Sequence, residues 1–139
     1  MSDKTYNILF LCTGNSARSQ IAEGWLRHMA GDRFEVHSAG THPVGLNPGS
    51  VEAMAEAGID LSQHRSKHVS EFAGQPFDYV ITVCDRAKES CPRWSGATQL
   101  LHWSFDDPAA VSDPEARRVT FSRVRDEIGA SIRDFLKER

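Results

Sequence analysis

The sequence lacks a long hydrophobic run, an excess of basic residues and a set of cysteines large enough for a disulfide framework. No apolar run approaches the roughly 20 residues that a membrane-spanning helix needs. The formal net charge is −3, so no chain-wide basic field favours nucleic acid or an anionic membrane. The polar start of the chain has no secretory signal, and we therefore expect a cytoplasmic protein.

The chain contains three cysteines, which is a low and an odd number. Disulfides are rare in the cytoplasm, so structural bridges are not expected and the cysteines become candidates for chemistry. The 139 residues fit one domain, residues 1–139, and nothing in the sequence demands more than a monomer.

Short strands alternate with amphipathic helices along the chain. The predicted strands are Asn7 to Leu11, Phe34 to Ser38, Phe77 to Cys84 and Thr98 to Trp103. The predicted helices run from about Ala17 to Ala30, from Asn47–Pro48 to Gly58, and onward from Pro114, the last with Phe121, Val124, Ile128, Ile132 and Phe135 on its apolar face. This alternation predicts a three-layer α/β fold, in which a four-stranded parallel sheet carries helices on both faces. Ligands of such sheets bind beyond the carboxyl ends of the strands, near the switch in strand order.

The segment after the first predicted strand has the features of an anion-binding loop. It contains a cysteine, five further residues and an arginine, and it leads into a helix. Successive backbone N–H groups in such a loop form a concave nest for a tetrahedral oxyanion, and Gly14 and Asn15 suit the left-handed backbone of a tight nest. A guanidinium adds a planar clamp for two anion oxygens. The predicted oxyanion-binding residues are Thr13, Gly14, Asn15, Ser16, Ala17 and Arg18.

The same loop acts on Cys12. A thiol at a helix N-terminus beside a guanidinium is largely thiolate near neutrality and is therefore a nucleophile. Ser19 is placed to donate a hydrogen bond to the sulfur. The alternative is a buried, inert cysteine that ends a strand, which is common for free cysteines. The complete Cys-to-Arg spacing between a strand and a helix favours the catalytic interpretation.

An acidic pair follows the fourth predicted strand at Asp106 and Asp107. When an oxyanion is transferred, a carboxylic acid that faces the nucleophile can give a proton to the leaving oxygen. Pro108 holds the preceding residue extended and so fixes its direction. The alternative is an ordinary Asp-Pro turn. Together with the anion loop, the position favours Asp107 as the acid over Asp106.

The other two cysteines, Cys84 and Cys91, lie near the end of the third predicted strand. Two thiols close in sequence beside a reactive thiolate suggest disulfide exchange, which proceeds by thiolate attack on sulfur. The alternative is one core cysteine and one incidental surface thiol. Zinc is not expected, because Cys-x6-Cys is not a usual ligand spacing and the six histidines show no metal-like spacing.

These motifs resemble the low-molecular-weight protein tyrosine phosphatase superfamily and, within it, the arsenate reductases of the thioredoxin-coupled type. The loop CTGNSARSQ is similar to the reductase loop, whereas phosphatases usually have a second cysteine and a proline where Ala17 and Gln20 stand. The segment from Cys84 to Pro92 and the run His102 to Ala109 also match the reductases. The resemblance covers nearly the whole chain.

The resemblance implies a relay. Cys12 attacks arsenate held by Arg18, Asp107 protonates the departing oxygen, and Cys84 attacks Cys12 and releases arsenite. Cys91 then moves the disulfide to Cys84–Cys91, which thioredoxin reduces. No bound cofactor is implied. Glutaredoxin or a small thiol remains an alternative reductant.

Some members of the family bind a monovalent cation beside the loop. Here the corresponding stretch, Gln63 to Lys67, is basic, which argues against a cation site. Arg65 or Lys67 would supply the positive charge in its place, while Asn15 and Ser38 would be structural. The alternative for the two basic residues is a solvated surface.

Two other functions fit parts of the sequence. A phosphatase acting on phosphotyrosine or a small phosphoester would use Cys12, Arg18 and Asp107 in the same way, but it has no need of three cysteines. A non-catalytic oxyanion-binding or redox-sensing module would need neither a nucleophile nor an acid. The intact set of residues therefore favours the reductase.

Overall fold

A four-stranded parallel sheet forms the centre of the structure, a computed structural model that describes residues 5–72, 74–83 and 99–138. The strand order is β2-β1-β3-β4, and all three pairings are parallel. The strands are β1 (Tyr6–Cys12), β2 (Phe34–Gly40), β3 (Tyr79–Thr82) and β4 (Gln99–His102). The helices are α1 (Arg18–Ala30), α2 (Pro48–Glu56) and α4 (Pro114–Lys137), with two short 3-10 helices, η1 (Val69–Phe72) and η2 (Pro108–Ala110). The predicted parallel sheet is confirmed.

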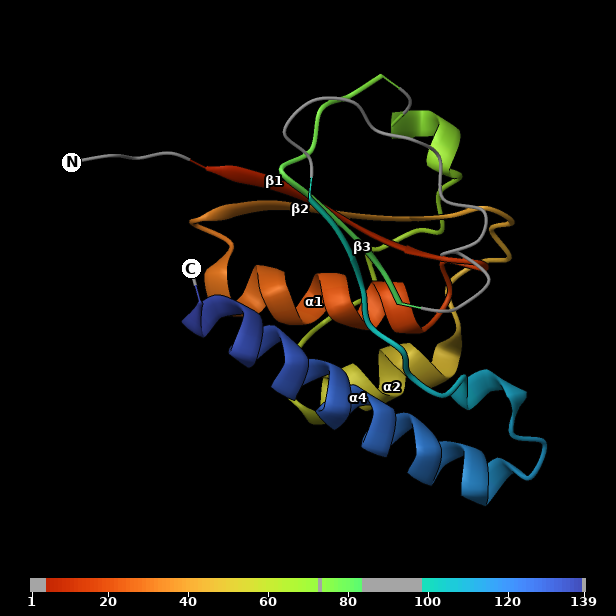
Figure 1. The fold of residues 1–139 in the computed structure, drawn as a ribbon. Helices are drawn as coiled ribbons and strands as arrows, with labels where there is room; N and C mark the ends of the chain where they lie inside the picture. Colours follow the sequence, from red (N-terminus) through yellow and green to blue (C-terminus); the bar gives the residue numbers. More distant parts are fainter. Residues whose placement is uncertain (1–4, 73, 84–98, 139) are drawn as a thin grey trace.

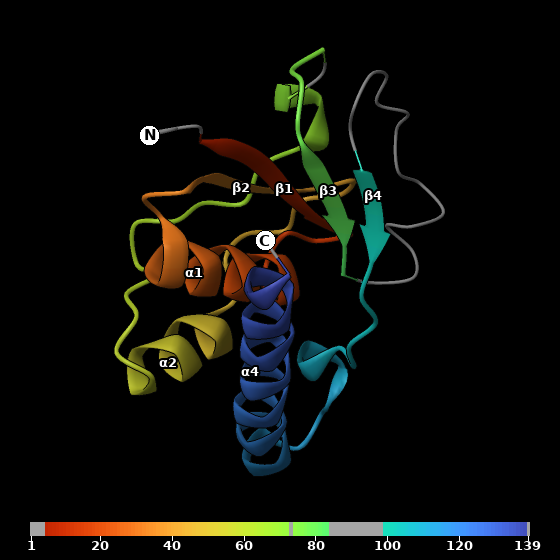
Figure 2. The same ribbon diagram turned by 60° about the vertical axis from the view of Figure 1, so that its left-hand side comes forward.

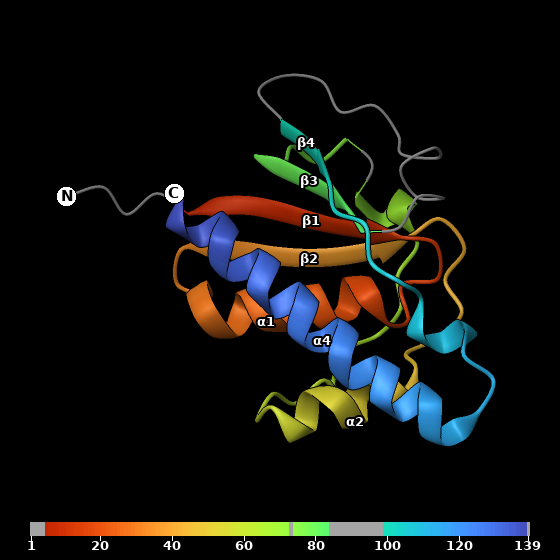
Figure 3. The same cartoon turned by 60° about the horizontal axis from the view of Figure 1, so that its bottom comes forward.

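The elements are arranged in layers. Helices α1, α2 and α4 lie on one side of the sheet, and η1 lies on the other (Figure 1). Figure 2 shows the strands in their order across the sheet, and Figure 3 shows α4 crossing α1 and α2. The three-layer arrangement is thus as predicted, although among the described residues the second face carries a short 3-10 helix and not an α-helix. No helix in the described part of the chain is long and apolar enough to span a bilayer.

The burial of β1 follows from its position between β2 and β3, with both faces of the sheet covered. Residues Ile8 to Leu11 are fully buried, as expected for a strand covered on both faces. On one face, the rings of Tyr6, Phe34, Tyr79 and Phe135 form a cluster, in which the contacting pairs have centroid separations of 5.2 to 6.4 Å. On the other face, the His37 ring contacts Phe72 of η1 at 5.2 Å.

Helix α4 begins as the sequence predicts. The Asp113 carboxylate accepts a hydrogen bond from Ala116 N at 2.8 Å and caps the helix, and Pro114 occupies the first turn. All five residues of the predicted apolar face are buried. Trp25 of α1 donates from Nε1 to Arg125 O at 3.0 Å and so fixes α4 against α1.

Several strand boundaries differ from the prediction, and β1 is one residue longer at each end, from Tyr6 to Cys12. β2 runs on to Gly40 because Ala39 and Gly40 continue the parallel pairing with Leu11 and Cys12. β3 begins only at Tyr79 and ends at Thr82. Cys84 and Thr98, the predicted limits of neighbouring strands, lie outside the described residues.

Replacing Ile128 by alanine tests the core beneath α4. Ile128 is fully buried, so the substitution should lower the free energy of unfolding by about 2 to 4 kcal/mol. Val119→Ala, on the same helix but 58% exposed, should change it by about 0.5 kcal/mol or less. Urea unfolding measures both values, and an equal loss in the two variants would contradict the assigned packing.

Candidate active site

The candidate site lies where the strand order reverses. The chain passes from β1 to β2 on one side and later to β3 on the other, so the carboxyl end of β1 is the switch point at which ligands of parallel sheets bind. Cys12 is the last residue of β1, and α1 begins at Arg18. The loop of residues 13–17 connects them.

All carbonyl groups of this loop accept hydrogen bonds from neighbouring segments or from α1. Their hydrogen bonds are Thr13 O from His42 N (2.8 Å), Gly14 O from Val44 N (3.1 Å), Asn15 O from Ser66 Oγ (2.6 Å), Ser16 O from Asn47 N (3.0 Å) and Ala17 O from Ile21 N (2.8 Å). In a trans peptide the N–H points away from the preceding C=O. The N–H groups of residues 14–18 therefore point away from these carbonyl partners, and Asn15 N points at Cys12 Sγ, an arrangement that is compatible with an oxyanion nest.

Asn15 holds the loop in this shape. Its backbone is left-handed, with a φ of 48°, and it is completely buried. Its Oδ1 accepts from the backbone N–H of Lys67 at 2.8 Å, which can only donate, and this identifies Nδ2 as the atom that faces the two serines. Nδ2 donates to Ser19 Oγ at 2.8 Å and to Ser38 Oγ at 3.0 Å. Each serine keeps its own proton for another partner.

The proton of Ser19 is directed at the nucleophile. When Cys12 is a thiolate, its sulfur can only accept, so the Ser19 hydroxyl, 2.8 Å away, donates to Cys12 Sγ while its oxygen accepts from Asn15 Nδ2. Asn15 N also donates to Cys12 Sγ, at 3.1 Å. Two donors at the sulfur, together with the start of α1, stabilise the thiolate relative to the thiol. The predicted contact between Ser19 and Cys12 is present.

Arg18 joins the loop to the segment after β4. Its Nη1 donates to Phe105 O at 3.1 Å, and its Nη2 lies 3.7 Å from Asp107 Oδ2. Asp107 is extended, with a φ of −86° and a ψ of 104°, and caps η2 by accepting from Ala109 N at 3.0 Å. The carboxylate is 44% exposed beside the guanidinium. It therefore borders the same end of the sheet as Cys12.

The two adjacent acids point to different partners. Asp106 Oδ2 pairs with Arg123 Nη2 of α4 at 2.9 Å, and its side chain is 74% exposed. This contact directs Asp106 toward α4, whereas Asp107 faces Arg18. The geometry thus favours Asp107 over Asp106 as a proton donor at the loop.

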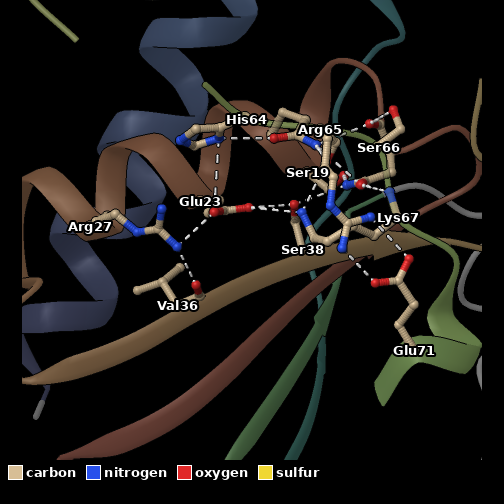
Figure 4. A network of polar contacts seen from close by, with 12 residues as sticks. Ser19, Glu23, Arg27, Val36, Ser38, His64, Arg65, Ser66, Lys67 and Glu71 are labelled. Carbon is tan, nitrogen blue, oxygen red and sulfur yellow. Dashed lines mark hydrogen bonds and ion pairs between the residues drawn. The ribbon is translucent and has the colours of Figure 1, made fainter. Parts of the chain in front are cut away.

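A buried acid lies behind the loop. Glu23 of α1 accepts from Ser38 Oγ at 2.6 Å and from Arg27 Nη2 at 2.8 Å (Figure 4). His64 Nδ1 lies 3.8 Å and Lys67 Nζ 3.9 Å from the same carboxylate. Burial lowers the pKa of both His64 and Lys67, and the Glu23 charge opposes this in each case. Polar groups thus surround the carboxylate on several sides.

Comparisons with known proteins agree with this geometry. Residues 7–139 match the sequence profile of the family described as low molecular weight phosphotyrosine protein phosphatase. The chain belongs to this family. An arsenate reductase from Bacillus licheniformis is 48% identical over 136 residues, which cover 97% of this chain and 96% of that protein. One from Halalkalibacterium halodurans is 46% identical over 129 residues, or 92% and 93% of the two chains.

A solved structure shows the same fold. The thioredoxin-dependent arsenate reductase of Corynebacterium glutamicum has a TM-score of 0.77 and 29% identity to this chain. The match covers 99% of this chain and 63% of that longer protein. The family membership and the fold that the sequence motifs implied are therefore confirmed.

Three parts of this site were not predicted from the sequence. Gln20 is fully buried and donates from Nε2 to Asn15 O and Oδ1, at 3.2 and 3.1 Å. Glu23 is the buried acid, and Gly40 brings β2 close to the loop. Polar residues one turn apart on the inward face of α1 were the available signal for the first two.

Some expectations need correction or lie beyond the structure. Gly14 does not have a positive φ, and the left-handed position of the loop is Asn15 alone. Of the two basic candidates, Lys67 approaches Glu23, whereas Arg65 pairs with Glu71 at 2.7 Å on the surface. Cys84 and Cys91 lie outside the described residues. In the described part of the chain, no group of three His, Cys, Asp or Glu side chains is placed to hold a metal ion.

Gly40→Ala tests the close approach of β2 to the loop. A Cβ there would lie 2.4 Å from Thr13 O and 2.9 Å from Asn15 N, so the loop backbone must shift. We expect phosphate to bind on the order of tenfold to a hundredfold more weakly by titration calorimetry. Gly58→Ala, at a φ of +83° after α2, should cost about 1 kcal/mol of stability yet leave phosphate affinity unchanged. Equal affinity in the parent and Gly40→Ala would refute this role for Gly40.

Proposed function

We propose that this protein reduces arsenate to arsenite, with Cys12 as the nucleophile and Cys84 and Cys91 as resolving cysteines. The observation that carries the proposal is Cys12 Sγ, which receives hydrogen bonds from Asn15 N and Ser19 Oγ inside an oxyanion nest. The names and the high identity of the relatives support arsenate as the substrate. The roles of Cys84 and Cys91 rest on the sequence motif.

The first step forms a bond between sulfur and arsenic. The nest residues Thr13 to Ala17 and the Arg18 guanidinium hold the arsenate oxygens, while the Cys12 thiolate attacks arsenic. An As–O bond breaks, and the departing oxygen takes a proton from Asp107. The Arg18–Asp107 contact of 3.7 Å supports these roles for the acid and the clamp, and donors aimed at an oxyanion stabilise the developing charge.

The next steps transfer two electrons. The Cys84 thiolate attacks Cys12 Sγ, an S–S bond forms, and arsenic keeps the electron pair of the broken S–As bond and leaves as arsenite. The Cys91 thiolate then attacks Cys84 and releases the Cys12 thiolate. A dithiol reductant reduces the resulting Cys84–Cys91 disulfide and restores the enzyme.

Thioredoxin is the proposed electron donor, because the Corynebacterium glutamicum relative is named as thioredoxin-dependent. A reducing compartment regenerates such a relay, and the cytoplasm provides one. We propose that residues 1–139 work as one domain and as a monomer, without a bound cofactor.

The relay is tested by NADPH oxidation with thioredoxin, thioredoxin reductase and arsenate. We expect turnover that depends on arsenate and is lost in Cys12→Ser and Cys84→Ser. Cys91→Ser should release about one equivalent of arsenite and then stop, because the Cys12–Cys84 disulfide stays trapped. Full multiple turnover of Cys91→Ser would rule out the relay. Absence of arsenate turnover, with clear hydrolysis of a phosphoester, would assign the site to a phosphatase.

The neighbouring aspartates provide a matched pair of variants. Asp107→Asn should lower kcat by on the order of a hundredfold or more, since the leaving oxygen loses its proton donor. Asp106→Asn removes the same charge one residue away but only breaks the surface pair with Arg123, so its kcat should stay close to the parent value. Steady-state kinetics compare the two, and a larger loss in Asp106→Asn would reverse the assignment.

A further inference from the structure

The acid behind the loop has no part in the proposed chemistry. Glu23 is only 4% exposed, and a buried carboxylate is costly unless it is paired and hydrogen-bonded. Several charged and titratable groups face this region. They are Arg27 on α1, Asp60, His64, Arg65 and Lys67 on the segment between α2 and η1, and Glu71 on η1.

A continuous chain of hydrogen bonds connects Glu23 to the nucleophile. Ser38 donates to Glu23, Asn15 donates to Ser38 and also to Ser19, and Ser19 donates to the thiolate form of Cys12. The carboxylate thus orders the hydroxyl and amide groups that aim a proton at the sulfur. Its negative charge has the opposite effect, because a nearby anion disfavours a second anion such as the thiolate.

Lys67 contacts both Asn15, through its backbone, and Glu23, through its side chain. Its backbone N–H holds Asn15 Oδ1 at 2.8 Å, and its Nζ lies 3.9 Å from Glu23 Oε1 and donates to Arg65 O at 3.0 Å (Figure 4). The Lys67 side chain is 13% exposed, whereas that of Arg27 is 50% exposed and loses more of its effect to water. Burial lowers the pKa of His64, which reduces its charge near neutrality.

We propose that Lys67 is a positioning residue, whose partly buried ammonium neutralises Glu23 and so keeps the Cys12 thiolate stable in the loop. The inference rests on the proposed function in one respect, which is the role of Cys12 as the nucleophile. It assigns opposite electrostatic effects to two residues that touch neither substrate nor sulfur. Removing the ammonium should raise the pH at which Cys12 ionises, and removing the carboxylate should lower it.

The test is a pH titration of the Cys12 thiolate by its ultraviolet absorbance. The full chain carries Cys84→Ser and Cys91→Ser, which leaves Cys12 as the single thiol of the three, and the same protein with Cys12→Ser provides the blank. We expect Lys67→Met to raise the midpoint by about one pH unit and Glu23→Gln to lower it. The double variant should return close to the parent midpoint, since both charges are gone.

Two further variants serve as controls. Arg65→Met removes a cation from the same segment, but that side chain is 66% exposed and pairs with Glu71, so its midpoint should not move. Lys67→Arg keeps the charge and should stay near the parent. If Lys67→Met does not fold, the comparison of Glu23→Gln with the double variant gives the same answer, because adding Lys67→Met should then raise the midpoint.

The proposal is overturned if Lys67→Met leaves the midpoint unchanged, or if Lys67→Met and Glu23→Gln move it in the same direction. A purely structural role would lower stability in both variants without this opposition of sign. The titration contains no arsenate, so it succeeds or fails separately from the reductase assay. Opposite shifts without arsenate turnover would support the role of Lys67 and reject the proposed function.

Discussion

The amide of Asn15 is the contact on which the candidate site depends. Its oxygen is fixed by the backbone N–H of Lys67, so its nitrogen must face Ser19 and Ser38, and both hydroxyl directions follow. The left-handed φ of 48° turns the Asn15 N–H toward Cys12 Sγ in the same residue. An asparagine tolerates this conformation better than most residues, and its buried side-chain amide is satisfied by Lys67 N, Ser19 and Ser38. One residue thus determines the shape of the nest and the environment of the sulfur.

In the rest of the fold, the residues that stabilise the protein and the residues that shape the site lie at opposite ends of the sheet. Toward the amino ends of the strands, Tyr6, Phe34, Tyr79 and Phe135 form an aromatic cluster that contributes stability by burial. At the carboxyl ends, the structure buries Asn15, Ser19, Gln20, Glu23, Ser38 and Ser50, each of which has a hydrogen-bond partner. Satisfied polar groups add little net stability but specify one arrangement. The sheet therefore supplies the stability, and its carboxyl end supplies the geometry.

The features that the sequence could predict are those set by residues close to one another in the chain. The Cys-x5-Arg spacing after an apolar strand predicted an anion-binding loop before α1 and the contact between Ser19 and Cys12, because these residues are consecutive in the chain. The apolar face of α4 followed from its 3.6-residue period. For the choice between Asp106 and Asp107, Pro108 was the only signal in the sequence, and the contacts with Arg18 and Arg123 come from the tertiary fold. Gln20 and Glu23 look like ordinary polar residues of α1, since their partners at residues 64–67 arrive through the tertiary fold.

A buried acid near a thiolate has a physical logic once both of its effects are considered. Glu23 accepts a hydrogen bond from the Ser38 hydroxyl, so Ser38 Oγ accepts from Asn15 Nδ2. This orients the donors around Cys12. The same charge would disfavour the thiolate if it were uncompensated. The Arg27 side chain is half exposed to solvent, and burial lowers the pKa of His64. The Lys67 ammonium, whose side chain is 13% exposed, is therefore the counter-charge that acts on Glu23 with the least screening by water. Glu23 thus keeps its role of orienting the hydrogen-bond donors around Cys12. The Lys67 ammonium cancels the effect of the Glu23 negative charge on the thiolate.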